Sequence, residues 1–97
     1  HSQSVQVNQY LYIFGGFDGK KTTNEMLKFN LESHKFSKLN LLLKPHPRQQ
    51  HAMCSIEHKI YIHGGFDGDQ FFDDLWEFDT QMNVFKQINF NFKYSKP

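Results

Sequence analysis

The sequence predicts an all-β protein built from two copies of one four-stranded antiparallel unit. A shift of 49 residues places residues 8–40 on residues 57–89, with ten identities in 33 positions and no gap. Gly-Gly-Phe-Asp-Gly falls at the same place in both copies, at residues 15–19 and 64–68. Aromatic residues make up 16% of the 97 residues, and aromatic side chains favour packed strands.

The first half of each copy reads as a hairpin followed by a turn. Residues 10–14 and 59–63 are short aromatic and β-branched runs, each ended by a glycine pair, and residues 4–7 and 52–56 precede them as partner strands. An Asp-Gly dipeptide follows each glycine pair and predicts a turn, because glycine takes positive φ without steric cost. We therefore assign structural roles to Gly15, Gly16, Asp18 and Gly19, and to Gly64, Gly65, Asp67 and Gly68.

The second half of each copy is ambiguous from periodicity alone. Apolar residues between 71 and 85 satisfy helical spacing as well as a hairpin. Two details favour the hairpin: residues 79–83 form a turn-like break, and Trp76 alternates with its neighbours in strand fashion. We expect packing roles for Trp76, Phe78 and Phe85, and for their counterparts Phe29 and Phe36 in the first copy.

Four short strands per repeat, with glycine and aromatic markers at fixed positions, are typical of the blades of a β-propeller. Residues 41–48 contain two prolines and read as the connection between blades. We place the first blade at residues 1–44, partial at its N-terminus, and the second at residues 45–97 with a C-terminal connection. Two blades leave two sheet faces uncovered, so we expect an incomplete ring that needs further blades, from a longer protein, copies of this chain or other chains.

Three segments of the second copy resemble the Kelch repeat. Arg48-Gln49-Gln50-His51 resembles its Arg-x-x-His opening, residues 60–65 its Gly-Gly strand, and residues 74–79 its aromatic strand with a closing Asp. The resemblance extends over both copies and nearly the whole chain. It also identifies His51 as a blade-packing residue. The outer-strand tryptophan often found in this family is Phe36 in one copy and Phe85 in the other, and Asn30 stands at the position of Asp79.

Composition argues against several classes of partner. The net charge is +1 and the basic residues are scattered among the acidic ones, which argues against nucleic acid and against an anionic membrane surface. No apolar run of 18 residues occurs, so no membrane-spanning segment is predicted. Cys54 is the sole cysteine and excludes an intrachain disulfide, which fits the cytosol or the nucleus. Its apolar neighbours predict a buried structural thiol.

No catalytic or cofactor pattern is present. The glycine pairs lack the Lys-Ser/Thr of a phosphate-binding loop, and the acidic residues between 67 and 74 lack EF-hand spacing. The histidines form no compact zinc set, and no nucleophile has an adjacent base. We therefore expect no enzyme activity, cofactor or metal in this chain. One alternative stays open: a fragment of a Kelch-like propeller enzyme or specifier protein whose active residues lie in other blades.

The resemblance implies a non-catalytic protein-interaction module, such as a scaffold, an adaptor or a substrate receptor in a ubiquitin-ligase or cytoskeletal setting. In such propellers, loops at one face of the ring bind peptide or protein partners, and aromatic and arginine residues are the usual energetic anchors. The candidate partner-binding residues here are Arg48, Phe66, Asp67, Phe71 and Phe72. The alternative for Phe71 and Phe72 is that they cover the blade edge or pack on a neighbouring blade.

Overall fold

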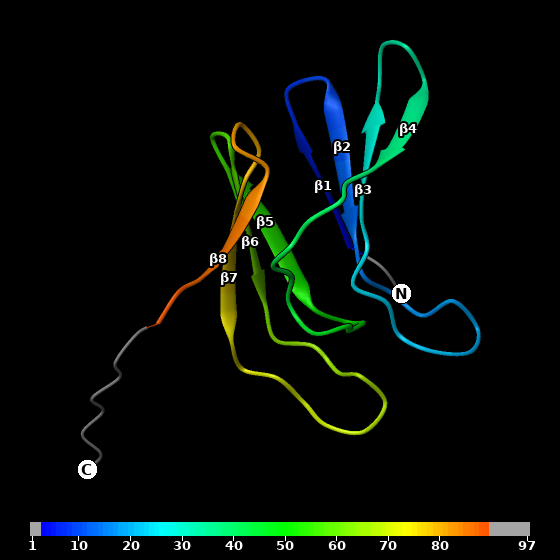
Figure 1. The fold of residues 1–97 in the computed structure, drawn as a ribbon, viewed down its shortest axis with the longest axis vertical. Helices are drawn as coiled ribbons and strands as arrows, with labels where there is room; N and C mark the ends of the chain where they lie inside the picture. Colours follow the sequence, from blue (N-terminus) through cyan, green and yellow to red (C-terminus); the bar gives the residue numbers. More distant parts are fainter. Residues whose placement is uncertain (1–2, 90–97) are drawn as a thin grey trace.

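The computed structural model describes residues 3–89, which form two four-stranded antiparallel sheets (Figure 1). The strands of each sheet are paired in the order in which they occur along the chain. Blade 1 consists of β1 (Gln3–Val7), β2 (Tyr10–Phe14), β3 (Met26–Asn30) and β4 (Lys35–Lys38). Blade 2 consists of β5 (Ala52–Ile56), β6 (Lys59–His63), β7 (Leu75–Asp79) and β8 (Val84–Gln87). The all-β prediction is confirmed, and within residues 3–89 no helix occurs.

The hairpin in the second half of each blade is stabilised by an Asx turn. In blade 2 the Asp79 Oδ1 accepts hydrogen bonds from the backbone N–H groups of Gln81 and Met82 at 2.9 and 3.1 Å. Asn83 then takes a left-handed conformation with φ 56°, which asparagine tolerates better than most residues. In blade 1 the Asn30 Oδ1 makes the equivalent two bonds. Asparagine therefore replaces aspartate here without loss of the turn.

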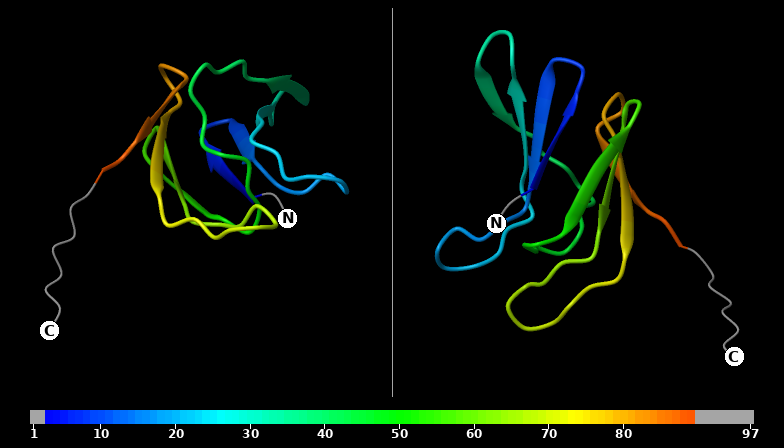
Figure 2. Two further views of the ribbon diagram at one scale, coloured as in Figure 1. Left: turned by 60° about the horizontal axis from the view of Figure 1, so that its bottom comes forward. Right: turned by 180° about the vertical axis from the view of Figure 1, so that it is seen from behind.

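The two sheets face each other in both views of Figure 2. They pack through alternate residues of their strands. Blade 1 contributes Val7, Tyr12, Phe14 and Met26, and blade 2 contributes Ile60, Ile62, Trp76, Phe78 and Phe85. The ring centroids of Tyr12 and Phe78 lie 6.1 Å apart, and those of Phe14 and Phe85 lie 5.6 Å apart. The first strands of the blades, β1 and β5, lie side by side, and the Ser55 hydroxyl donates to the Gln6 carbonyl across them.

Each blade also has one sheet face that no other described residue covers. The pair Phe29 and Phe36 lies opposite in register across β3 and β4, as Phe78 and Phe85 do across β7 and β8. Phe85 is 4% exposed against blade 1, whereas Phe36 is 63% exposed. The face of blade 2 that packs on blade 1 is buried, whereas the equivalent face of blade 1 is open to solvent.

Cys54 is exposed, and the expectation of a buried thiol is wrong. It lies on the face of β5 that also carries Ala52 and Ile56, both exposed, because side chains alternate along a strand. The other face, with Met53 and Ser55, turns toward blade 1. A run of apolar residues thus indicated a strand correctly but not which of its faces is covered.

The boundary between residues 44 and 45 stays a prediction. The first sheet ends at Lys38 and the second begins at Ala52, so that boundary falls within a linker that contains no named strand. The C-terminal connection predicted after blade 2 lies, from residue 90 on, outside the described residues.

Candidate interaction surface

Two long loops extend from the same end of the blades, opposite the short hairpin turns (Figure 1). Loop 1 comprises residues 15–25 between β2 and β3, and loop 2 comprises residues 64–74 between β6 and β7. A single antiparallel bridge narrows each loop, joining Phe17 to Thr22 and Phe66 to Phe71. The loops share one backbone geometry and differ in the side chains that they present.

An aspartate at the tip of each loop makes a further Asx turn. The Asp67 Oδ1 accepts hydrogen bonds from the backbone N–H groups of Asp69 and Gln70 at 2.9 and 2.8 Å. Asp18 accepts the equivalent two bonds from Lys20 and Lys21 at 3.0 Å each. The bonds from Gln70 and Asp69 hold the pKa of Asp67 below its usual value. The carboxylate of Asp67 therefore shapes loop 2, and one of its oxygens is already engaged within the loop.

Arg48 is a buried linker residue whose side chain binds loop 2. Its side chain is fully buried and makes two parallel hydrogen bonds to the Asp74 carboxylate, at 2.6 and 2.9 Å. Its guanidinium also donates to the carbonyls of Gly64 and His46 at 3.0 Å. Burial alone would raise the pKa of Asp74, but the hydrogen bonds from Arg48 and Trp76 lower it. Arg48 is thus inaccessible to a partner in this conformation, and its effect on a surface is through the loops that it holds.

The backbone around Arg48 joins the two loops to each other. Its carbonyl accepts from Gly16 at 2.8 Å and its N–H donates to Thr23 at 3.1 Å, both in loop 1. The next residue, Gln49, exchanges two backbone bonds with Phe66 of loop 2, at 2.9 and 3.0 Å. Two residues of the linker therefore act as a short strand between loops from different blades.

The glycine pairs allow this close approach. A Cβ on Gly15 would lie 2.6 Å from the Arg48 carbonyl oxygen, and one on Gly65 would lie 2.9 Å from the Gln49 carbonyl oxygen. Both glycines have positive φ, 73° and 107°. The backbone of the linker occupies the space that a side chain would need, so these positions restrict the residue to glycine.

His51 is buried between the same elements, with 2% of its surface exposed. Its ring packs edge-on against that of Phe14, with ring centroids 5.5 Å apart. Neither ring nitrogen has a hydrogen-bond partner among the described residues. Burial lowers the pKa of His51 to about 4. The nearby Phe14 backbone opposes this shift, although it makes no hydrogen bond to the ring, and the positive charge of Arg48 lowers the pKa further. The histidine is held neutral where the blades meet.

The two phenylalanines of loop 2 point in different directions. Phe72 is half-buried, with the Arg48 guanidinium 4.4 Å from its ring centroid and His46 against it. Phe71 is 81% exposed and stacks on Phe66, with ring centroids 4.5 Å apart and planes 29° apart. We call Phe66 and Phe71 the aromatic pair. At the position of Phe71, loop 1 carries Thr22 beside an exposed Phe17, so only loop 2 has such a pair.

Asp74 was not singled out as a site residue from the sequence, although it connects three elements. It accepts from Arg48 of the linker and from the indole N–H of Trp76 on β7, at 2.8 Å for the indole. The equivalent residue in blade 1 is Glu25, which instead lies 3.7 Å from Lys38. An acidic residue before the third strand of both copies was the one signal, and it does not by itself indicate a buried partner.

Residues 3–89 contain no group of three or more His, Cys, Asp or Glu side chains placed to hold a metal ion. Over the same residues, no helix is long and apolar enough to cross a membrane.

Two four-stranded antiparallel sheets, packed face to face with their long loops at one end, define blades of a β-propeller. A family model described as the KLHDC2/KLHL20/DRC7 Kelch-repeats domain matches residues 1–97. The chain belongs to this Kelch-repeat family. No curated protein matches it. Kelch-repeat domains are generally non-catalytic modules of protein interaction, and membership of the family indicates a protein-interaction module of propeller type.

Proposed function

We propose that the chain is a non-catalytic part of a cytoplasmic or nuclear scaffold, adaptor or substrate receptor, and that loop 2 contacts its protein partner. The observation that carries this proposal is the aromatic pair. Phe71 exposes 81% of its surface while stacked on Phe66, and Phe66 is fixed by two backbone hydrogen bonds to Gln49. A large ring held in place and open to solvent loses little conformational entropy when a partner covers it, which is typical of interface anchors.

The roles of the other candidate residues follow from their contacts. Asp67 fixes the turn of loop 2, and it is half-exposed with one oxygen free of the turn bonds. Phe72 and Arg48 support the loop from inside. We therefore propose that Phe66, Phe71 and Asp67 contact the partner, while Arg48 and Phe72 position them.

The test compares partner recovery by the protein and by its Phe71→Asp variant, using proximity labelling in cells followed by binding of the recovered partner in purified form. We expect Phe71→Asp to weaken that binding by tenfold or more, the equivalent of about 1.4 kcal/mol. The matched control is Leu31→Asp, because Leu31 is an exposed apolar residue in the β3–β4 turn at the opposite end. Equal binding by wild type and Phe71→Asp, with unchanged thermal melting, would remove loop 2 from the interface.

We also propose that further blades, in this protein or in another chain, cover the open faces of the two blades. The open face of blade 1 carries apolar residues at positions that are buried in blade 2, such as Phe36, which is 63% exposed, and this supports the proposal. If Phe36 stays exposed, Phe36→Ala costs less than about 1 kcal/mol of unfolding free energy; if a blade covers it, the cost approaches the ~3–5 kcal/mol expected of a buried phenylalanine such as Phe85. A small cost in the protein as expressed, beside a large one for Phe85→Ala, would refute the covering blade.

A further inference from the structure

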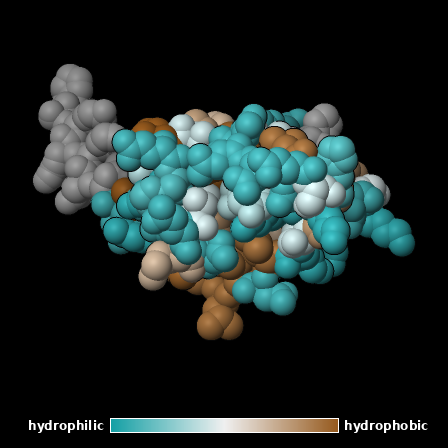
Figure 3. Space-filling model, turned by 90° about the horizontal axis from the view of Figure 1, so that it is seen from above, coloured by the Kyte–Doolittle hydropathy of each residue, from teal (hydrophilic) through white to brown (hydrophobic). Residues whose placement is uncertain are grey.

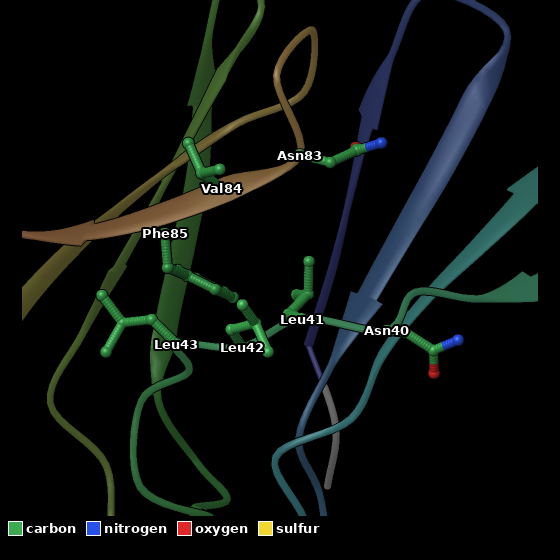
Figure 4. A pocket seen from close by; sticks show the side chains of 7 residues that line it. All are labelled: Asn40, Leu41, Leu42, Leu43, Asn83, Val84 and Phe85. Carbon is green, nitrogen blue, oxygen red and sulfur yellow. The ribbon is translucent and has the colours of Figure 1, made fainter.

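A groove runs along the perimeter of the molecule where the outer strands of the two blades meet the linker. Its apolar end has a volume of about 410 Å³ and is lined by Leu41, Leu42 and Leu43 of the linker and by Val84 and Phe85 of β8. In Figure 4 the Phe85 side chain points toward the linker segment that carries Leu41 and Leu42. We call this space, together with its continuation along blade 1, the perimeter groove.

The leucines of the linker are more exposed than a connection between blades requires. Leu42 is fully exposed and Leu43 is 55% exposed, and Val84 across the groove is 51% exposed. Figure 3 shows a hydrophobic group projecting from a mostly hydrophilic surface. Exposed leucine costs free energy in water, about 25 cal/mol for each Å² that a partner could cover. Contiguous apolar residues with a polar surround are typical of an interaction site.

The other end of the groove is basic. Two further hollows of about 260 and 320 Å³ share Leu39 with each other, and the smaller shares Leu41 and Leu42 with the apolar end. Among the described residues, their charged lining side chains are four lysines and one glutamate: Lys28, Lys35, Lys38, Lys44 and Glu25.

The charge of these lysines is only partly balanced. Lys38 pairs with Glu25 at 3.7 Å. Within residues 3–89, Lys28, Lys35 and Lys44 have no carboxylate within salt-bridge distance. The Lys28 ammonium lies 4.1 Å from the Tyr10 ring centroid, and this cation–π contact holds it at the groove. The groove thus joins an apolar surface to a cluster of cations.

We propose that the perimeter groove binds an extended acidic segment of a partner protein that carries a leucine-sized anchor. The anchor packs between Leu41–Leu43 and Phe85, and carboxylates of the segment pair with Lys28, Lys35 and Lys44. Both walls and the linker belong to this chain, so blades added on either open face leave the groove accessible. The proposal is therefore independent of the contact surface on loop 2.

The direct test uses fluorescein-labelled octapeptides and the purified protein. One peptide has a leucine pair followed by four glutamates, and a second has the reverse order, so that orientation does not decide the outcome. Fluorescence anisotropy should give saturable binding that weakens as salt is raised. Replacing the glutamates with glutamines should weaken it by tenfold or more.

Variants then assign the binding to the groove. Leu42→Asp removes the apolar wall, and the double variant Lys35→Glu with Lys44→Glu reverses the charge; each should raise the Kd by tenfold or more. The matched control is Lys20→Glu with Lys21→Glu, which makes the same change of charge on loop 1, and its Kd should stay within about twofold of wild type. The substituted side chains are not buried, and circular dichroism checks that each variant is folded.

Three results would overturn the proposal. The first is no binding of either peptide up to millimolar concentration. The second is equal loss in the loop 1 control, which would indicate a non-specific response to net charge. The third is binding to phosphatidylserine vesicles, sensitive to Leu42→Asp, without binding to the peptides; the groove would then serve an anionic lipid surface instead.

Discussion

Replacing Arg48 with alanine should destabilise the protein more than any exposed substitution, because it leaves Asp74 without its ionic partner. The Arg48 side chain makes four hydrogen bonds, two of them to the Asp74 carboxylate. Removing one member of a buried ion pair typically costs ~3–5 kcal/mol. The Asp74 side chain is 20% exposed, so water reaches the carboxylate and the expected cost lies at the lower end, about 3 kcal/mol.

The assay is urea denaturation followed by tryptophan fluorescence. Trp76 is the only tryptophan and donates its indole N–H to Asp74, so its emission reports directly on this network. The control is Lys20→Ala, an exposed residue of loop 1, which should change the unfolding free energy by less than about 0.5 kcal/mol.

A double-mutant cycle with Arg48→Ala and Asp74→Ala separates the ion pair from the loss of packing. The two substitutions remove the same interaction, so their effects should fall short of additivity by about 2 kcal/mol. Additive effects, or a cost of Arg48→Ala below about 1 kcal/mol, would refute the view that this pair joins the linker to loop 2.

Three further outcomes follow from the same contacts. Because the pKa of His51 is lowered to about 4 in the folded state, the unfolded state binds more protons between pH 6.5 and about 4. The unfolding free energy should therefore be unaffected by His51 above pH 6.5 and fall by about 3 kcal/mol as the pH is lowered through that range. In His51→Phe this pH dependence should be absent, and an unchanged slope of unfolding free energy against pH would contradict the assignment. Gly15→Ala should destabilise by more than ~2 kcal/mol because its Cβ would meet the Arg48 carbonyl, whereas Gly19→Ala meets open space and bears only the conformational cost of about 1 kcal/mol; equal effects in thermal melts would argue against the close approach. Asp67→Ala should lower the protection of loop 2 amides against hydrogen exchange. Asp67→Asn should keep most of that protection, because an amide oxygen still accepts the two turn bonds, as Asn30 does in blade 1. Loss of protection in both variants would assign the effect to the charge of Asp67.

Much of the fold could be predicted because its determinants are local. The aromatic runs ended by glycine pairs gave strands at the expected residues, and β2 and β6 match them residue for residue. The ambiguity between helix and hairpin was resolved by Asp79, whose side chain caps the turn and leaves Val84 free to begin β8. A turn depends on a few adjacent residues, and those residues are visible in a sequence.

The candidate site was less accessible to sequence reasoning. Arg48 was expected at a contact surface, but it is buried by Asp74, 26 residues away, and by the ring of Phe72. Phe71 and Phe72 are chemically alike and adjacent, and contacts with residues distant in the chain distinguish them: Phe72 packs on Arg48 and His46, whereas Phe71 stacks on Phe66 at the surface. The lysines of the perimeter groove looked scattered along the chain because strand pairing, not sequence, brings them together.

By itself, the sequence determined the repeat, the strands and the turns. The repeat is visible as a 49-residue periodicity, and the Asp-Gly and Asx turns depend on residues adjacent in the chain. The tertiary structure decided which faces are covered. The same alternation that buries Phe85 leaves Phe36 exposed, because only blade 2 has a neighbour on that side. It also decided why glycine stands at Gly15, because a Cβ added there would lie 2.6 Å from the Arg48 carbonyl oxygen of the linker. Such contacts join residues far apart in the chain, so their energies depend on packing that no local pattern contains.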